Sequence, residues 1–115
     1  MNKSIIISLF LTNLLIADVI WLKEAPNRMN WNDAMKYCQD KGAILPSKKV
    51  FKDIWYKNNR ASDLEGFDIS VSYWTSDEVL DNKKYAAYPF YFMQGRDTWY
   101  YKADRYGVRC IKNIK

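Results

Sequence analysis

The sequence predicts a small α+β domain, and three observations lead to that prediction. Residues 29–42 and 48–57 each show apolar residues at helical spacing. The chain after residue 69 is rich in the β-branched and aromatic residues that favour strands. A short apolar run, residues 19–22, precedes both helices. The order of one strand, two helices and then several antiparallel strands is typical of the α+β class.

The chain begins with a segment typical of a secretory signal peptide. A charged start leads into an apolar run from Ile5 to Ile16, and the small residue Ala17 follows. The run is shorter than the roughly 20 residues that span a bilayer. We expect residues 1–17 to be a signal peptide and residues 18–115 to form a bacterial domain, either periplasmic or secreted. A membrane anchor or a buried first helix is the alternative.

The first predicted helix carries recognisable start and stop signals. Asn30 or Asn32 can cap its first turn, because an Asn side chain accepts a hydrogen bond from a free backbone N–H there. Gly42 ends the helix, since glycine enters the left-handed conformation at little cost. Ala34 and Cys38 lie four residues apart and therefore share one face.

The second helix is expected to follow Pro46 directly. Ser47 is a good N-cap for a helix from Lys48 to about Lys57. Its apolar face would contain Val50, Phe51, Ile54 and Trp55. Its other face carries Lys48, Lys49, Lys52 and Lys57. We expect that face to be solvated, and a patch for an anionic partner is the alternative.

The rest of the chain predicts strands and turns. The expected strands are residues 71–75, 85–93, 97–102 and 107–112. Residues 58–68 and 77–84 are polar and are expected to form loops. Gln94 and Gly95 indicate a hairpin turn. Pro89 cannot donate a ladder hydrogen bond, so it predicts an edge strand or a bulge.

The two cysteines, Cys38 and Cys110, are expected to pair if the chain is exported. The bond would tie the first helix to the last strand. In the chain-entropy model a loop of about 70 residues gains roughly 4 kcal/mol of stability. Two free thiols are the alternative.

Histidine is absent from the sequence, which excludes several kinds of chemistry. Histidine is the usual general base near neutral pH and the commonest metal ligand. Serine–histidine and cysteine–histidine catalysis cannot occur, and two cysteines are too few for an all-thiolate zinc site. We therefore expect no catalytic residues, no bound metal and no cofactor. The full chain has a net charge of +5, which falls to +4 if the predicted signal peptide with Lys3 is removed. This charge is moderate, and an exported protein rarely meets nucleic acid, so we expect no nucleic-acid partner.

Five pieces of sequence occur in an order that resembles a known family. They are M-N-W-N-D-A-M-K-Y-C at 29–38, L-P-S at 45–47, Y-W-T-S at 73–76, F-x-x-G-R at 92–96 and G-V-R-C-I at 107–111. Together they resemble the Lcl C-terminal domain, a bacterial domain of unknown function. That family is related to the C-type-lectin-like and sulfatase-modifying-factor folds.

The resemblance implies a small C-type-lectin-like domain with one disulfide, in which two helices pack on a twisted antiparallel sheet. It gives structural roles to Trp31, Ala34, Pro46, Trp74 and Arg109. Some relatives end collagen-like adhesins, but this chain has no collagen-like repeat. The sulfatase-modifying relatives are enzymes that use paired cysteines, whereas here the only pair is assigned to the disulfide.

Two acidic motifs could suggest calcium, and neither is expected to bind it. The tripeptide Trp31-Asn32-Asp33 occurs in C-type lectins, but here it begins a helix, and Ala25-Pro26-Asn27 lacks the accompanying carboxylate. Asp77, Glu78 and Asp81 are expected to form a solvated loop. One of the first two is a candidate partner for Arg109, because an inward-facing arginine needs a carboxylate. A ligand-binding Arg109 is the alternative.

The late strands supply the candidate binding residues. Aromatic residues make up 17% of the chain and concentrate after residue 85. Because strands alternate faces, one set is core and the other reaches the surface beside cations. The candidate residues are Tyr91, Arg96, Trp99, Tyr101, Lys102 and Arg105. They predict a non-enzymatic, adhesin-like module for a surface glycan or acidic polysaccharide. A structural or protein-partner-binding domain is the alternative, and the oligomeric state stays open.

Overall fold

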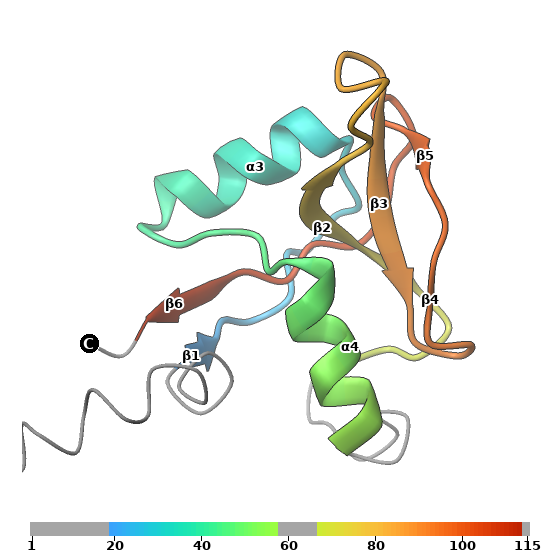
Figure 1. Ribbon diagram of the computed structural model, residues 1–115. Coiled ribbons are helices and arrows are strands. Elements are labelled where there is room, and N and C mark those ends of the chain that lie inside the picture. Colours follow the sequence, from blue (N-terminus) through green and yellow to red (C-terminus); the bar gives the residue numbers. More distant parts are fainter. Residues whose placement is uncertain (1–18, 58–66, 114–115) are drawn as a thin grey trace, which may run out of the picture.

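The computed structural model describes residues 19–57 and 67–113 (Figure 1). The predicted signal peptide and most of the predicted loop at 58–68 lie outside the described residues. The elements are β1 (Val19–Trp21), α3 (Trp31–Asp40), α4 (Lys48–Lys57), β2 (Ser72–Glu78), β3 (Ala86–Tyr91), β4 (Arg96–Asp97), β5 (Tyr100–Tyr101) and β6 (Ile111–Asn113). The predicted α+β order is confirmed.

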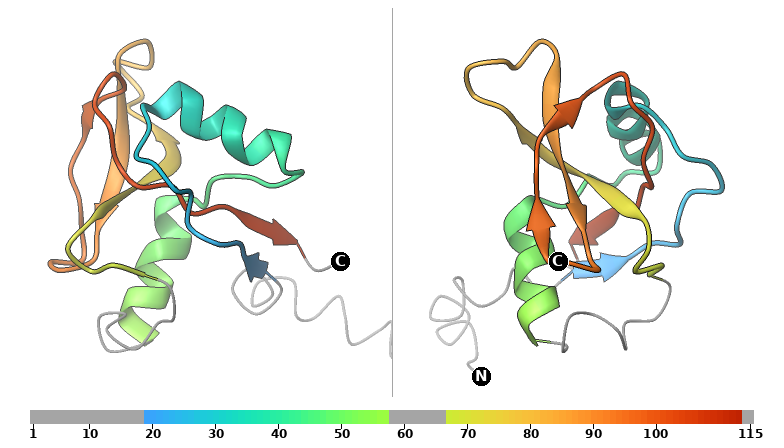
Figure 2. Two further views of the ribbon diagram at one scale, coloured as in Figure 1. Left: turned by 180° about the vertical axis from the view of Figure 1, so that it is seen from behind. Right: turned by 90° about the vertical axis from the view of Figure 1, so that its right-hand side faces the viewer.

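The strands form two antiparallel sheets (Figures 1 and 2). Strands β1 and β6 pair near the chain ends, with Val19 opposite Asn113. The larger sheet has the order β2-β3-β4, and β5 pairs with β3 beyond the end of β4. Helix α3 packs beside β2, while α4 contacts both β2 and β3. The two helices therefore pack on the larger sheet.

Helix α3 begins and ends where the sequence predicts. The Asn30 side chain accepts a hydrogen bond of 2.8 Å from the Asp33 N–H. Gly42 has a φ of +67° just after the helix, the left-handed conformation that favours glycine. The buried side carries Trp31, Ala34 and Cys38.

The disulfide joins Cys38 to Cys110, with the two Cα atoms 5.5 Å apart. Both cysteines are buried in a first core cluster that also contains Leu45, Trp74 and Val108. Trp74 lies edge-on against Tyr106, with ring centroids 5.0 Å apart. The predicted pairing is confirmed, and it ties α3 to the segment that leads into β6.

Helix α4 covers a second, mostly aromatic core cluster. Phe51 has no exposed surface and stacks on Phe90, with ring centroids 5.6 Å apart. The Ser47 hydroxyl accepts the Val50 N–H at 3.3 Å, which confirms the predicted cap. An additional carboxylate, that of Asp77, accepts the Lys48 N–H at 2.7 Å and suits the positive end of the helix dipole.

The strand β2 is longer than predicted. It extends to Glu78, with an irregular register between Trp74 and Glu78. Thr75 occupies this bulge, where its hydroxyl donates to the Tyr88 carbonyl and accepts the Asp77 N–H. Side-chain hydrogen bonds thus replace ladder bonds, and propensity alone could not predict that.

Strand β3 is central, so Pro89 does not lie at an edge, but the predicted alternative, a bulge, is confirmed: Pro89 pairs with Trp74, where the β2–β3 register shifts. The pairs Tyr91↔Arg96 and Ala86↔Tyr101 belong to one continuous register, which would place Pro89 opposite Thr98. Pro89 has no N–H for this ladder. The predicted strand over 97–102 is accordingly divided into β4 and β5, and the bulge lies on the other neighbour, β2.

Arg109 is buried, but its predicted partners are wrong. Its Nε donates to the Leu22 carbonyl, and its guanidinium lies 4.6 Å from the centroid of the Phe67 ring. Asp77 accepts the N–H of Lys48, and Glu78 pairs with Lys102. Arg109 therefore joins the N-terminal segment to the core, which is a structural role.

Candidate functional site

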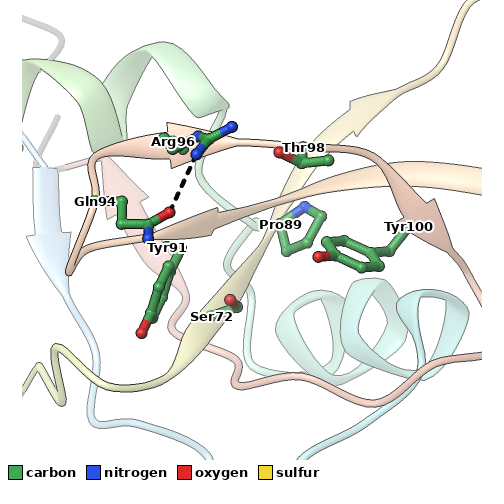
Figure 3. Close-up of a pocket in the computed structure, with 7 residues that line it drawn as sticks. All are labelled: Ser72, Pro89, Tyr91, Gln94, Arg96, Thr98 and Tyr100. Atoms are coloured by element: carbon green, nitrogen blue, oxygen red, sulfur yellow. Dashed lines mark hydrogen bonds between the residues drawn. The ribbon is translucent and has the colours of Figure 1, made fainter.

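A groove of about 300 Å³ opens on the face of the larger sheet that is formed by alternate residues of β3, β4 and β5 (Figure 3). We call it the tyrosine groove. Its lining residues are Ser72, Pro89, Tyr91, Gln94, Arg96, Thr98 and Tyr100.

Strand alternation brings these side chains together. Arg96, Thr98 and Tyr100 are two residues apart along β4 and β5, so they share a face. Tyr91 lies opposite Arg96, and the buried ring of Pro89 lies between the two tyrosines (Figure 3). The flat proline surface with a tyrosine on each side makes a shallow apolar floor.

The rim of the groove is polar and carries one cation. Arg96 Nη1 donates to Gln94 Oε1 at 3.4 Å, and both side chains are exposed. The lining also offers the hydroxyls of Ser72, Thr98 and Tyr100. No carboxylate lines the groove among the described residues. The groove thus combines aromatic surface, neutral hydrogen-bonding groups and a guanidinium.

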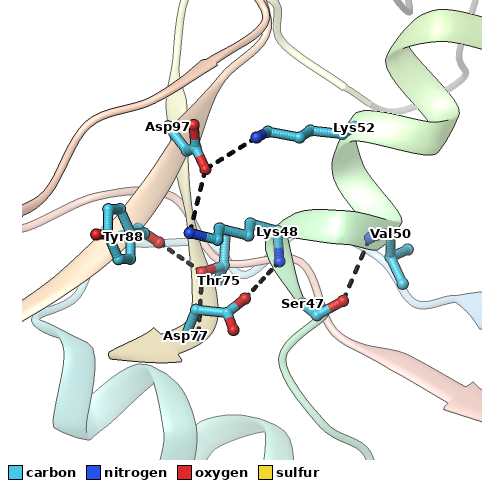
Figure 4. A network of polar contacts seen from close by, with 8 residues as sticks. All are labelled: Ser47, Lys48, Val50, Lys52, Thr75, Asp77, Tyr88 and Asp97. Atoms are coloured by element: carbon cyan, nitrogen blue, oxygen red, sulfur yellow. Dashed lines mark hydrogen bonds and ion pairs between the residues drawn. The ribbon is translucent and has the colours of Figure 1, made fainter. Parts of the chain in front are cut away.

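The hairpin that carries this rim is supported from behind by α4. Gly95 turns with a φ of +64°, and Trp55 lies directly beneath it, donating from Nε1 to the Phe92 carbonyl at 2.7 Å. Asp97 points to the side of the sheet that faces α4, where Lys48 and Lys52 pair with it at 3.5 and 3.2 Å (Figure 4).

These contacts change the interpretation of the lysine face of α4. Lys48 pairs with Asp97, and its ammonium lies 3.9 Å from the centroid of the Tyr88 ring. Lys49 pairs with Asp53 along the exposed side of the helix. Three of the four lysines therefore take part in ion pairs within the domain, which leaves less unpaired charge than the sequence suggests.

The predicted binding residues do not form one site. Tyr91 and Arg96 line the tyrosine groove. Trp99 and Tyr101 lie on the opposite face of β5 and contact each other edge-on, with centroids 5.4 Å apart. Arg105 is exposed in the turn after β5.

Lys102 belongs to the interior instead. It is 8% exposed, and its ammonium bonds to the Glu78 carboxylate at 2.6 Å and to the Lys83 carbonyl. It also lies 4.0 Å from the centroid of the Trp31 ring. Since its donors are occupied within the fold, we assign Lys102 a structural role rather than the predicted binding role.

Two further hollows flank the end of the sheet. One, of about 390 Å³, is lined by Asn30, Asn32, Lys84, Tyr85, Tyr101, Lys102 and Ala103. The other, of about 580 Å³, contains the acidic residues Asp77, Glu78 and Asp81. In the described part of the chain, no three histidine, cysteine or carboxylate side chains are arranged so that they could hold one metal ion, and that includes these three. Asp77 and Glu78 instead bond to Lys48 and Lys102.

Sequence reasoning missed Tyr100, Thr98, Gln94 and Ser72. The sequence contained part of the information. Arg96, Thr98 and Tyr100 occupy alternate positions of the predicted strand, and the predicted hairpin turn places that strand beside Tyr91. The sequence did not show which of the two faces of these strands is exposed to solvent.

This architecture is that of a C-type-lectin-like domain. A similar solved structure is TC14, a C-type lectin from the tunicate Polyandrocarpa misakiensis, with a TM-score of 0.63 and 16% identity over 85% of this chain and 100% of that chain. Botrocetin is also similar, with a TM-score of 0.58 and 17% identity over 85% of this chain and 92% of that chain. At these identities the likeness establishes the fold alone.

Residues 21–112 match a family described as a domain of unknown function (DUF8780), and the chain belongs to that family. The finer assignment to the Lcl C-terminal domain stays a prediction. No curated protein matches the chain.

Proposed function

We propose that this chain is an exported, non-enzymatic binding module whose tyrosine groove holds part of an acidic polysaccharide. The observation that carries the proposal is the composition of the groove. Tyr91 and Tyr100 offer aromatic surface on either side of Pro89, and Arg96 stands at the rim. Small-ligand sites typically combine apolar walls with a few convergent polar groups.

Each part of the groove fits one part of such a ligand. Aromatic rings can pack against the C–H surfaces of a sugar ring, and the surrounding hydroxyls and amide can bond to its hydroxyls. A guanidinium binds a carboxylate through two parallel hydrogen bonds. The absence of a lining carboxylate avoids repulsion of an acidic sugar.

Calorimetric binding to polygalacturonate and to its methyl ester tests this proposal. We expect the acid to bind and the ester to bind more weakly, because the ester has the same backbone without the charge. Arg96→Gln should weaken acid binding by about 10-fold or more, as hydrogen bonds to charged groups contribute about 1.5–3 kcal/mol. Tyr100→Ala should weaken binding of both polymers.

Two exposed residues outside the groove supply matched controls. Tyr56, on α4, is 74% exposed, and Arg105 lies in a turn. Tyr56→Ala and Arg105→Gln should leave binding unchanged. If Arg105→Gln lowers the affinity as much as Arg96→Gln does, the groove is not the site. If a panel of neutral and acidic polysaccharides gives no binding to folded protein, the proposal is wrong.

Export is part of the same proposal. A disulfide and an oxidising compartment fit together. Within the described residues, no helix has the length and apolar character needed to cross a membrane. Expression with the native N-terminus followed by N-terminal sequencing should give a mature chain that begins at Asp18. A chain that keeps Met1 would contradict this.

A protein-partner-binding domain is the second candidate. The exposed aromatic pair Trp99 and Tyr101 favours it, since both rings are about half exposed, at 44% and 55%. Exposed aromatic residues are enriched at interfaces.

A further inference from the structure

The outer edge of the larger sheet is bare. Strands β4 and β5 pair with β3 on one side, and no described strand pairs with them on the other. Figures 1 and 2 show them at the outside of the molecule, with no helix or strand beyond them. We call the segment Arg96–Tyr101 the open edge.

The ladder with β3 fixes which backbone groups of the open edge point outward. The Lys102 N–H donates to the Tyr85 carbonyl at 2.7 Å, and Tyr91↔Arg96 belongs to the same register. Even-numbered residues of the edge therefore face β3, and Asp97, Trp99 and Tyr101 face away. Among the described residues, the only backbone bond at these outward groups is the one from the Asp104 N–H to the Tyr101 carbonyl.

Several of the usual protections against edge pairing are missing, although β4 and β5 are short, with two residues each, and Arg96 and Asp97 are charged. Proteins protect an edge strand with proline, lysine, a bulge or a covering loop. The open edge contains neither proline nor lysine, since the nearby Pro89 lies on β3 and the nearby Lys102 is buried. Trp99, Tyr100 and Tyr101 are 44%, 43% and 55% exposed.

We propose that the open edge pairs antiparallel with the open edge of a second copy of this chain. The outward groups are self-complementary about Trp99. In that register Trp99 faces Trp99 of the second copy, and Asp97 faces Tyr101 of the second copy. Cross-strand aromatic pairs stabilise a sheet.

The charges of the open edge permit this pairing. Asp97 is the only acidic residue in it, and its carboxylate already pairs with Lys48 and Lys52 of its own chain. The register places Asp97 opposite a tyrosine rather than another carboxylate. The central pair is uncharged. The same register brings Arg96 opposite Lys102 of the second copy, but the Lys102 side chain is buried and its ammonium already pairs with Glu78 of its own chain.

The pairing has a consequence for the tyrosine groove, and this consequence alone rests on the proposed function. A two-fold axis perpendicular to the sheet reverses the strand and keeps each face on its own side. Both tyrosine grooves would therefore open on the same face of one continuous sheet. A polymer that reached both would gain avidity from the high effective concentration of the second groove.

Sedimentation velocity over a range of concentrations, without any ligand, tests the pairing. The wild-type protein should form a dimer. Trp99→Lys places two ammonium groups opposite each other and should raise the dimer dissociation constant by about 100-fold or more. Trp99→Pro removes an outward N–H that β3 does not use, and it should also give monomers.

Tyr56→Lys is the matched control, because it makes the same kind of change at an exposed site on α4. It should leave the dimer intact, and near-ultraviolet circular dichroism should show that all three variants are folded. A wild-type protein that stays monomeric up to millimolar concentration overturns the pairing, and so does a dimer that Trp99→Lys leaves unchanged. Neither result depends on whether the groove binds a polysaccharide.

Discussion

Two glycines with the same left-handed backbone conformation differ in how much space surrounds them. Gly42 and Gly95 both have left-handed φ values, of +67° and +64°. A Cβ at Gly42 would meet its nearest atom, on Lys112, at 3.9 Å, whereas a Cβ at Gly95 would lie 2.4 Å from the Trp55 ring. The hairpin turn therefore depends on glycine for space as well as for backbone conformation.

We expect Gly42→Ala to lower the free energy of unfolding by about 1 kcal/mol, the cost of a left-handed alanine. Gly95→Ala should cost about 2 kcal/mol more, because Trp55 must also move. Urea denaturation of both variants measures the difference. Equal losses would show that Trp55 does not constrain the turn.

Tyr73 is a buried side chain whose ionisation would oppose folding. Its hydroxyl donates to Glu24 at 2.7 Å and accepts the Asp68 N–H at 2.9 Å. Burial raises the pKa of Tyr73 well above its usual value. Burial raises the pKa of Tyr106 as well.

The sign of the pH effect follows from the raised pKa. The unfolded state releases the Tyr73 proton near pH 10, while the folded state keeps it. This contribution is complete below about pH 10 and is lost as the pH rises above it. Urea midpoints from pH 8 to pH 11 should therefore fall more steeply for wild type than for Tyr73→Phe. The variant should be less stable at pH 8 by about 1–2 kcal/mol, and parallel curves would contradict the assignment.

At the scale of elements, α4 and the β3–β4 hairpin are joined by a charged contact and an aromatic one. Asp97 keeps 17% of its side-chain surface exposed, while Lys48 and Lys52 keep 35% and 41%. Water and salt therefore screen this contact. The Trp55 contact beneath Gly95 is much less sensitive to salt.

We expect Asp97→Asn to cost about 1 kcal/mol or less at low salt, and less still in high salt. The control Asp53→Asn removes an ion pair within α4 alone, whose lysine is 70% exposed, and should cost less. Thermal unfolding with and without added sodium chloride compares them. A salt-independent loss for Asp97→Asn would indicate that its packing matters more than its charge.

Element boundaries were predictable where the signals were local. Asn30 and Gly42 bound α3, and Ser47 caps α4, because each acts on backbone groups within a few residues. Pro89 predicted a bulge only as an alternative to an edge position, and neither the placement of the bulge at Thr75 nor the division of β4 from β5 was predicted. Both features depend on how a strand pairs with its neighbour, and the residues of one strand do not show which residues of the neighbour lie opposite them.

At the scale of the molecule, the disulfide supports a small core. Cys38 and Cys110 are 72 residues apart in the sequence and close a loop that contains both α4 and the larger sheet. A domain of about 100 residues is close to the lower range of comfortable stability.

We expect the double variant Cys38→Ala/Cys110→Ala to lose roughly 4 kcal/mol of unfolding free energy. Native protein should show no reactive thiol, and reduced protein should unfold at a lower urea concentration. Two reactive thiols in the native protein would contradict the structure and reopen a cysteine-based enzyme as a hypothesis.

The sequence by itself determined the α+β class, the two helices with their caps and the disulfide partners. These depend on short-range hydrogen bonds, on apolar spacing and on there being only two cysteines. The tertiary structure decided which face of the late strands is outward, and so brought Tyr100 to Tyr91 and Arg96. It also buried Lys102 beside Glu78 and placed Arg109 against the Leu22 carbonyl and the Phe67 ring, while Asp77 and Glu78 bond to lysines. Alternation along a strand defines two faces, but only packing against α3 and α4 decides which of them water reaches.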